Sequence, residues 1–168
     1  PQPSRGGGRR RRPAPCRALH RRNRPERQRL LPRQGRPGET DRGYRWAGRY
    51  RTVRMTKDRS PFCFPENIAG EMRTLFARLH SADLLRGREA TAFAEEAAAF
   101  LAYLNAIHPF REGNGRTQLT FTALLAAQAD HPLKLSRLDP AGFLRAMIAS
   151  FFGDEAPLGR QLRNLVLD

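Results

Sequence analysis

The sequence has 168 residues, of which 39% are hydrophobic, enough for the core of one domain. Its formal net charge is +15. No run approaches the roughly 18 apolar residues of a membrane span, and no signal-peptide pattern is visible. The two cysteines, Cys16 and Cys63, show neither CxxC nor metal-ligand spacing. These features argue against a disulfide-rich secreted domain and predict a reduced, cytoplasmic setting without a membrane partner.

Residues 1–43 form a strongly basic arm. They contain fourteen arginines against three acidic residues, together with seven prolines, six glycines and almost no apolar run. Such a segment buries too little apolar surface to offset the entropy lost on folding, so we predict that it is disordered. The globular domain is expected at residues 44–168.

The charge of this arm has three competing interpretations. Its arginines suit non-specific binding to phosphates of nucleic acid, but no aromatic residue is interleaved to stack on bases, so nucleic acid is a disfavoured partner. A solvated tail without function is the second. The third is a truncated or misread N-terminus, because the first methionine is Met55 and a GC-rich gene read in the wrong frame yields Arg-, Pro- and Gly-rich sequence.

The first element expected in the globular part is a β-hairpin at about residues 51–64. Alternation through Tyr50, Thr52 and Arg54, a polar turn at "KDRS" and a short aromatic run are typical of two antiparallel strands. This is the one strand signal in the sequence, and Pro65 is expected to end the hairpin.

The rest of the sequence predicts helices, because apolar residues recur at intervals of three and four. The expected helices cover about residues 68–82, 89–107, 115–129, 140–153 and 158–167. Asp139 is the expected N-cap of the fourth helix, with Pro140 at its first position. The predicted fold class is therefore mainly α, with one hairpin on a helical core.

The sequence "HPFREGNGR" separates the second expected helix from the third. Pro109 halts the helix and leaves His108 at its end. Gly113, Asn114 and Gly115 can direct successive backbone N–H groups into one concavity, beside the positive end of the next helix dipole. This loop therefore predicts a binding site for a polyphosphate.

Side chains of the loop suit a reaction at phosphate. Glu112 is expected to hold Mg²⁺, which binds through one or two carboxylates plus phosphate oxygens. His108 titrates near neutrality and is the expected base for an attacking hydroxyl. Phe110 is expected to anchor the loop in the core. A helix-end histidine or a Gly-Asn-Gly turn is ordinary by itself, so the prediction depends on their combination.

These residues resemble the signature of the Fic domain family, His-Pro-Phe-x-(Asp/Glu)-Gly-Asn-Gly-Arg-x-x-Arg. The sequence from His108 to Arg116 matches every specified position, whereas Leu119 stands where the family has its final arginine. The segment "WAGRYRTV", residues 46–53, is similar to the family's lead into a hairpin called the flap. The resemblance covers roughly residues 44–168 and implies a Fic-like helical core with one β-hairpin flap.

The resemblance implies a protein adenylyltransferase, which transfers AMP from ATP to a Tyr, Thr or Ser hydroxyl of a target protein (AMPylation). His108 would be the base and Glu112 the Mg²⁺ ligand. The implied contacts of the nucleotide phosphates are Gly113, Asn114, Gly115 and Arg116. The flap would align the target as an added strand, with contacts at Met55, Thr56 and Lys57.

Leu119 leaves other classes open, because the family's arginine contacts the γ-phosphate and pairs with an inhibitory glutamate. A degenerate, non-enzymatic remnant that binds partners is one alternative. A phosphotransferase of the Doc type is another, disfavoured because those relatives carry lysine at the position of Gly115. The family's inhibitory pattern (Ser/Thr)-x-x-x-Glu-(Gly/Asn) is not matched, since Ser60 and Glu66 have the wrong spacing. The expected inhibitor is a separate small antitoxin protein of a bacterial toxin–antitoxin pair, or sequence lost before Tyr44.

Overall fold

The computed structural model of the chain describes residues 48–57 and 60–167. The basic arm predicted at residues 1–43, and its boundary with the globular domain, lie outside the described residues. The described elements are β1 (Thr56–Lys57), β2 (Ser60–Pro61), α1 (Pro65–Ser81), η2 (Asp83–Leu85), α2 (Ala90–Ile107), α3 (Asn114–Gln128), η3 (Leu135–Arg137), α4 (Pro140–Phe151) and α5 (Ala156–Leu165). None of these helices combines the length and apolar character needed to cross a bilayer. The predicted mainly α fold with one hairpin is confirmed for this part of the chain.

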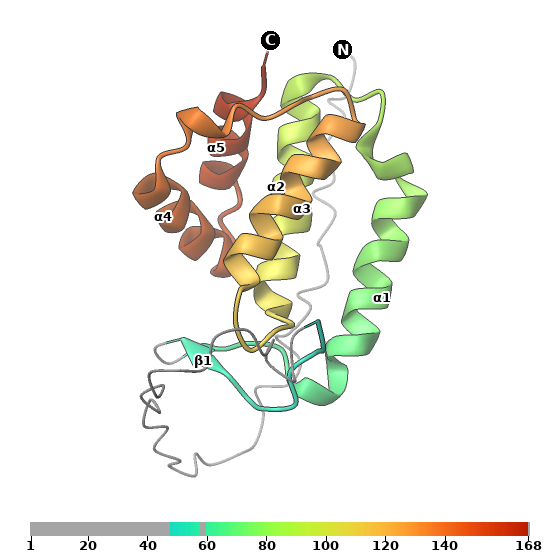
Figure 1. Ribbon diagram of the computed structural model, residues 1–168, viewed down its shortest axis with the longest axis vertical. Coiled ribbons are helices and arrows are strands. Elements are labelled where there is room, and N and C mark those ends of the chain that lie inside the picture. Colours follow the sequence, from blue (N-terminus) through green and yellow to red (C-terminus); the bar gives the residue numbers. More distant parts are fainter. Residues whose placement is uncertain (1–47, 58–59, 168) are drawn as a thin grey trace, which may run out of the picture. The chain divides into compact units, whose positions relative to one another are not determined.

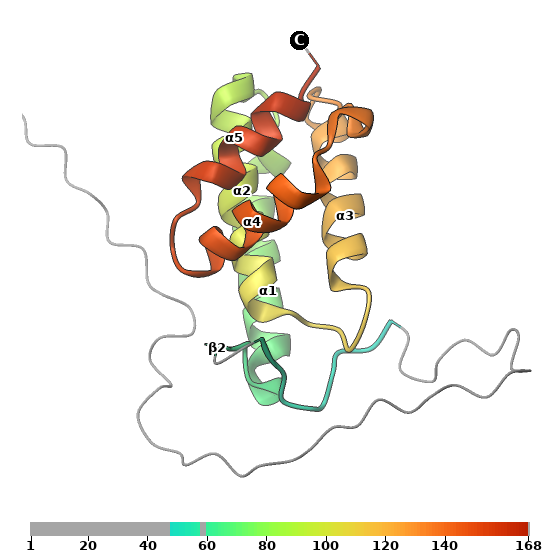
Figure 2. The same cartoon turned by 90° about the vertical axis from the view of Figure 1, so that its left-hand side faces the viewer.

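Helix α2 is the central element, and α1, α3, α4 and α5 all contact it. Figure 1 shows α1 on one side of α2 and α3, with α4 and α5 on the other side. Three large side chains of α2, those of Phe93, Leu101 and Ile107, are fully buried. Helix α5 approaches closely, because a Cβ added to Gly159 would lie 3.9 Å from the Cβ of Ala98. Figure 2 shows α5 crossing in front of α2.

Helix α1 begins at Pro65, three residues before the apolar pattern predicts. The expectation that Pro65 only ends the hairpin is therefore wrong. Proline fits the first helical position, where its missing N–H has no partner to lose and its fixed φ is already helical. The N-cap of α4 is as predicted: Asp139 Oδ1 accepts a hydrogen bond from the N–H of Ala141 at 3.0 Å.

The hairpin is shorter than the predicted span of residues 51–64. Strands β1 and β2 contain two residues each, and the register pairs Thr56 with Pro61 and Lys57 with Ser60. One further bond, from the N–H of Phe62 to the carbonyl of Met55 at 3.0 Å, lengthens the pairing. The alternating residues before Met55 are not a strand. The segment contains a buried arginine, Arg51, which binds the backbone of Val53 and of His108, and an alternating pattern does not reveal these contacts.

Candidate active site

The catalytic candidate His108 occupies the C-cap of α2. Its backbone is left-handed, with φ 49° and ψ 62°, and its N–H donates to the carbonyl of Leu104 at 3.0 Å. A positive φ is uncommon for residues other than glycine, so the surrounding structure must hold it. Pro109 follows and is fully buried. The chain therefore leaves the helix abruptly at His108, as the His-Pro pair predicts.

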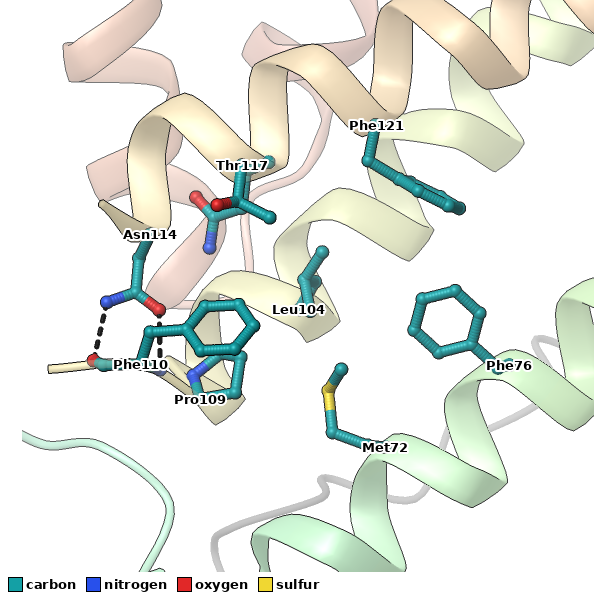
Figure 3. Close-up of a pocket in the computed structure, with 9 residues that line it drawn as sticks. Met72, Phe76, Leu104, Pro109, Phe110, Asn114, Thr117 and Phe121 are labelled. Carbon is teal, nitrogen blue, oxygen red and sulfur yellow. Dashed lines mark hydrogen bonds between the residues drawn. The ribbon is translucent and has the colours of Figure 1, made fainter. Parts of the chain in front are cut away.

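Asn114 closes the loop as a clamp. Its Oδ1 accepts a hydrogen bond from the N–H of Phe110 at 2.9 Å, and its Nδ2 donates to the carbonyl of Phe110 at 2.7 Å (Figure 3). The side chain is only 5% exposed. The sequence interpretation placed Asn114 among the phosphate contacts. Both polar atoms of the side chain are engaged with Phe110, so the backbone N–H and the second hydrogen of Nδ2 are left for an anion.

The start of α3 presents backbone N–H donors that have no acceptor among the described residues. Gly113 is the N-cap, with φ 79°, and its carbonyl accepts the first helical bond, from Thr117 N–H at 2.9 Å. The N–H groups of Asn114, Gly115 and Arg116 precede that bond and have no helical acceptor. A Cβ added to Gly115 would meet no atom within 4 Å, so the space at the side of this residue is open.

Arg116 adds positive charge beside these donors. It is exposed, and its Nη2 lies 3.6 Å from the place where a Cβ on Gly113 would stand. The guanidinium is thus folded back over the loop. Together with the helix dipole, it makes this corner of the molecule suitable for an anion such as a phosphate.

The imidazole of His108 lies in an apolar environment. The ring of Phe62 is stacked on it, with centroids 3.9 Å apart and an interplanar angle of 15°. Phe62 in turn meets Phe151 of α4 edge-on, at 5.6 Å. The Nδ1 atom of His108 is buried and makes no hydrogen bond of good geometry with the described residues.

These surroundings lower the pKa of His108 to about 4. Burial is the main cause, because it disfavours the charged imidazolium. The positive charges of Arg51 and Lys57 lower the pKa further, and the backbone carbonyl of Asn105 opposes them. The ring is consequently neutral at pH 7 and carries a free lone pair, as a general base requires.

The predicted metal ligand, Glu112, is exposed in the same loop. The described residues contain no group of three or more His, Cys, Asp and Glu side chains placed to hold a metal ion. A single carboxylate fits Mg²⁺ that is held mainly by phosphate oxygens and water. It would not fit a metal that requires a complete set of protein ligands.

One of the predicted flap residues, Lys57, lies near the same site. Met55 is half-buried, while Thr56 and Lys57 are exposed on β1. Lys57 is close enough for its charge to act on His108. Strand β1 pairs with β2 on one side, and no other described strand covers its outer edge. Within the described part of the chain, that edge is not paired with a strand and suits an added one.

Leu119, the departure from the family signature, is half-buried on α3. It lies three and four residues after Arg116 and Gly115, so the three share one face of the helix. The position thus borders the candidate anion site, but its side chain is uncharged.

Phe110 faces an apolar pocket between α1 and α3 rather than the centre of the core. Its ring is half-buried and lies 6.2 Å from that of Tyr50. The pocket is drawn in Figure 3 and is lined by Met72, Phe76, Leu104, Pro109, Phe110, Asn114, Thr117, Gln118 and Phe121. The expectation that Phe110 anchors the loop is consistent with this placement. The ring lines the pocket, and the backbone of the same residue is hydrogen-bonded to Asn114.

Sequence reasoning missed two residues that shape the site, Arg51 and Phe62. Arg51 is 2% exposed and binds the backbone around His108. Its side chain looks like any other in a chain with 31 lysines and arginines, so its burial has no signal in composition. Phe62 was visible only as part of an aromatic run after the hairpin turn.

With this geometry established, comparison with known proteins defines the family. The sequence profile of the Fic/DOC family matches residues 27–126, and the chain belongs to this family. The match begins before Tyr44, inside the segment predicted to be an arm. The boundary near residue 44 therefore stays a prediction.

Named relatives are protein adenylyltransferases. The chain is 50% identical over 124 residues to y4lH of Sinorhizobium fredii, named a probable protein adenylyltransferase; the alignment covers 73% of this chain and 65% of y4lH. It is 35% identical over 120 residues to the protein adenylyltransferase VbhT of Bartonella schoenbuchensis, covering 71% of this chain and 25% of VbhT. The chain thus spans less than two thirds of the length of either relative.

Solved structures support the same fold. The chain is similar to the BepC protein of Bartonella tribocorum with bound AMPPNP, with a TM-score of 0.64 and 27% identity over 73% of this chain and 66% of that one. It is also similar to the N-terminal Fic domain of a cell filamentation protein of Bartonella quintana with bound ADP. There the TM-score is 0.66 and the identity 26%, over 74% of this chain and 65% of that one.

Proposed function

We propose that this protein is a nucleotidyltransferase that moves AMP from ATP to a Tyr, Thr or Ser hydroxyl of a target protein. The observation that carries the proposal is the neutral imidazole of His108 at the end of α2, in the same loop as the unpaired N–H groups that open α3. A base and an anion site so placed suit attack by a hydroxyl on a phosphate. The names of the relatives, and the nucleotides bound to two similar structures, point to the same chemistry.

In this reaction the target hydroxyl loses its proton to His108. Its oxygen forms a bond to the α-phosphorus of ATP, the bond from that phosphorus to the bridging oxygen breaks, and pyrophosphate leaves. The N–H groups of Asn114, Gly115 and Arg116 stabilise the charge that develops on the phosphate oxygens, and the guanidinium of Arg116 adds to them. Mg²⁺ bound through Glu112 would neutralise further phosphate charge.

The flap provides the place for the target. A target segment added as a strand along β1 would contact Met55, Thr56 and Lys57. Such pairing holds the backbone of the target beside His108 and leaves its sequence largely unread. Positioning of this kind is a large part of catalysis at phosphate.

The partners follow from this scheme. We place the reaction in the cytoplasm, with ATP and Mg²⁺ as cofactors, a protein as target, and a separate small antitoxin protein as inhibitor. The described residues contain no internal match to the inhibitory pattern, since Ser60 belongs to β2 and Glu66 to the first turn of α1. Nucleic acid is not a partner in this scheme.

The test is transfer of label from ATP. With ATP labelled on the α-phosphate, the target becomes labelled; with the γ-phosphate labelled, it does not. The matched control is His108→Asn, because asparagine tolerates the left-handed backbone of this position but is not a base. We expect the variant to lose about 10²- to 10⁴-fold in rate while keeping its helical circular dichroism. Transfer of the γ-label would instead indicate a phosphotransferase.

One observation favours a second candidate, a Fic remnant without activity. Leu119 places an uncharged side chain on the helix face that borders the anion site, where the family signature has arginine. A remnant would transfer neither label, and binding of ATP would be weak.

A further inference from the structure

The side chain of Arg51 links three segments of the chain. Its Nε donates to the carbonyl of His108 at 2.7 Å, and its Nη2 donates to the carbonyl of Ile107 at 3.2 Å. The same Nη2 donates to the carbonyl of Cys63, just after the hairpin. Nη1 donates to the carbonyl of Val53 at 2.7 Å. One guanidinium therefore joins the lead into the flap, the exit from the flap and the end of α2.

The backbone of Arg51 strengthens this link. Its N–H donates to the carbonyl of Pro109 at 2.8 Å, so backbone and side chain together bind the three consecutive residues Ile107, His108 and Pro109. The last carbonyls of a helix lack partners, and a cation there is favourable for the dipole. The planar guanidinium can serve several carbonyls at once, which an ammonium group cannot do with the same geometry.

Among the described residues, no acid balances the charge of Arg51. No carboxylate in the described residues forms an ion pair with it, and the residue is 2% exposed. A buried charge without an ionic partner is costly, so its retention calls for a role. Backbone carbonyls satisfy its donors but leave a full positive charge near the imidazole of His108.

We propose that Arg51 is the positioning residue of the base: it holds His108 in its left-handed conformation and ties the flap to the catalytic loop. The catalytic part of this inference rests on the proposed function. The part that concerns the backbone and the ionisation of His108 does not, because it follows from the hydrogen bonds and the charge alone.

Two charged side chains of the described residues act on His108. Arg51 binds the backbone carbonyl of His108, and Lys57 lies on β1. The positive charges of both lower the pKa of the imidazole. Phe62, which is stacked on the imidazole, carries no charge, and neither does Phe151, which meets Phe62 edge-on. Removing the charge of Arg51 should therefore raise the pKa of His108. Replacing Arg51 with lysine keeps a positive charge, so it should change the pKa of His108 less.

The experiment compares Arg51→Gln with Arg51→Lys, each shown to be folded by circular dichroism. The imidazole of His108 is titrated by NMR, with its signal assigned from the loss in His108→Asn. We expect a higher pKa of His108 in Arg51→Gln and a nearly unchanged one in Arg51→Lys. Both variants should lose kcat for AMP transfer by about 10²-fold, because the base is displaced, with little change in KM for ATP.

Two further measurements keep the proposal testable if the wild type shows no AMP transfer or if the variants do not fold. If the wild-type chain transfers no AMP, the titration still tests the link between Arg51 and His108. If neither variant folds, the link is tested in the wild type by the NMR signal of the Arg51 Nε–H proton. This proton is hydrogen-bonded to the carbonyl of His108, so it should exchange slowly with water. Rapid exchange of that proton, or unchanged kcat and titration in folded Arg51→Gln, would overturn the proposal.

Discussion

The ring of Phe62 lies nearly parallel to that of His108, with centroids 3.9 Å apart. The stack covers one face of the imidazole and keeps water from it. Burial is the main reason that the pKa of His108 falls to about 4. The hairpin and the residue that follows it therefore act on His108 in two ways: Phe62 covers the ring, and Lys57 contributes charge.

The pH dependence of activity should reflect this environment. We expect the acid limb of kcat/KM for AMP transfer to lie near pH 4 rather than near 6.5, the ordinary value for histidine. Phe62→Ala should move the limb to higher pH, because the ring becomes hydrated, whereas Phe62→Leu should move it less. Rates measured from pH 4 to 8 test this. A wild-type limb at pH 6.5 would show that His108 is not held neutral.

Stability should change over the same pH range. Between about pH 6.5 and 4, the unfolded chain binds a proton at His108 that the folded chain does not. The stabilisation is therefore complete above pH 6.5 and is lost as the pH falls towards 4. Urea unfolding of the wild type over this pH range measures the effect. His108→Asn is the control, since the variant should lack this part of the pH dependence.

Asn114 should be needed for the shape of the loop. Asn114→Ala leaves the N–H and carbonyl of Phe110 without their partners, at a cost of about 1–3 kcal/mol in the free energy of unfolding. Asn114→Asp keeps an acceptor for the N–H of Phe110 but not a donor for its carbonyl, so it should cost less stability. Its negative charge should nevertheless weaken ATP binding more than alanine does. Urea unfolding and calorimetric titration with ATP measure the two effects, and equal ATP affinities would place the phosphates elsewhere.

Two glycines of the loop should respond in opposite ways. Gly113→Ala forces a side chain into φ 79°, so it should destabilise the fold by roughly 1–2 kcal/mol. Gly115→Ala adds a methyl group in open space inside a helix and should stabilise by up to about 1 kcal/mol. That methyl group would nonetheless narrow the proposed anion site beside the N–H donors. We therefore expect raised thermal stability with weakened ATP binding, and unchanged binding would argue against this anion site.

Helices, caps and the loop could be predicted from local pattern, whereas Arg51 could not. The N-cap at Asp139 and the break at Pro109 depend on residues close in sequence, so they were visible. Arg51 and His108 are brought together by packing between residues 57 positions apart. Nothing local distinguishes this arginine from its exposed neighbours. The clamp of Asn114 on Phe110 was missed for a related reason, because spacing does not say which atoms a side-chain amide will bind.

Glu112 should set the response to metal. Glu112→Gln replaces a charged ligand with a poorer neutral one for a hard cation, so the Mg²⁺ concentration for half-maximal AMP transfer should rise. Because the side chain is exposed, its removal should leave thermal stability nearly unchanged. Glu66→Gln, at an exposed site in the first turn of α1, is the matched control. Identical Mg²⁺ titrations for all three proteins would mean that Glu112 is only part of the loop.

Leu119 should limit both nucleotide binding and inhibition. It shares a helix face with Gly115 and Arg116, so an arginine at this position would stand beside the proposed anion site. We expect Leu119→Arg to raise ATP affinity roughly tenfold, as for a hydrogen bond to a charged group. The same change should make the protein sensitive to a supplied helix that carries the inhibitory glutamate, because a carboxylate buried against leucine lacks a partner. Leu119→Met is the control, and calorimetry with ATP and with the helix measures both effects. If the arginine variant changes neither, Leu119 does not face the phosphate site and the family signature is misaligned at its last position.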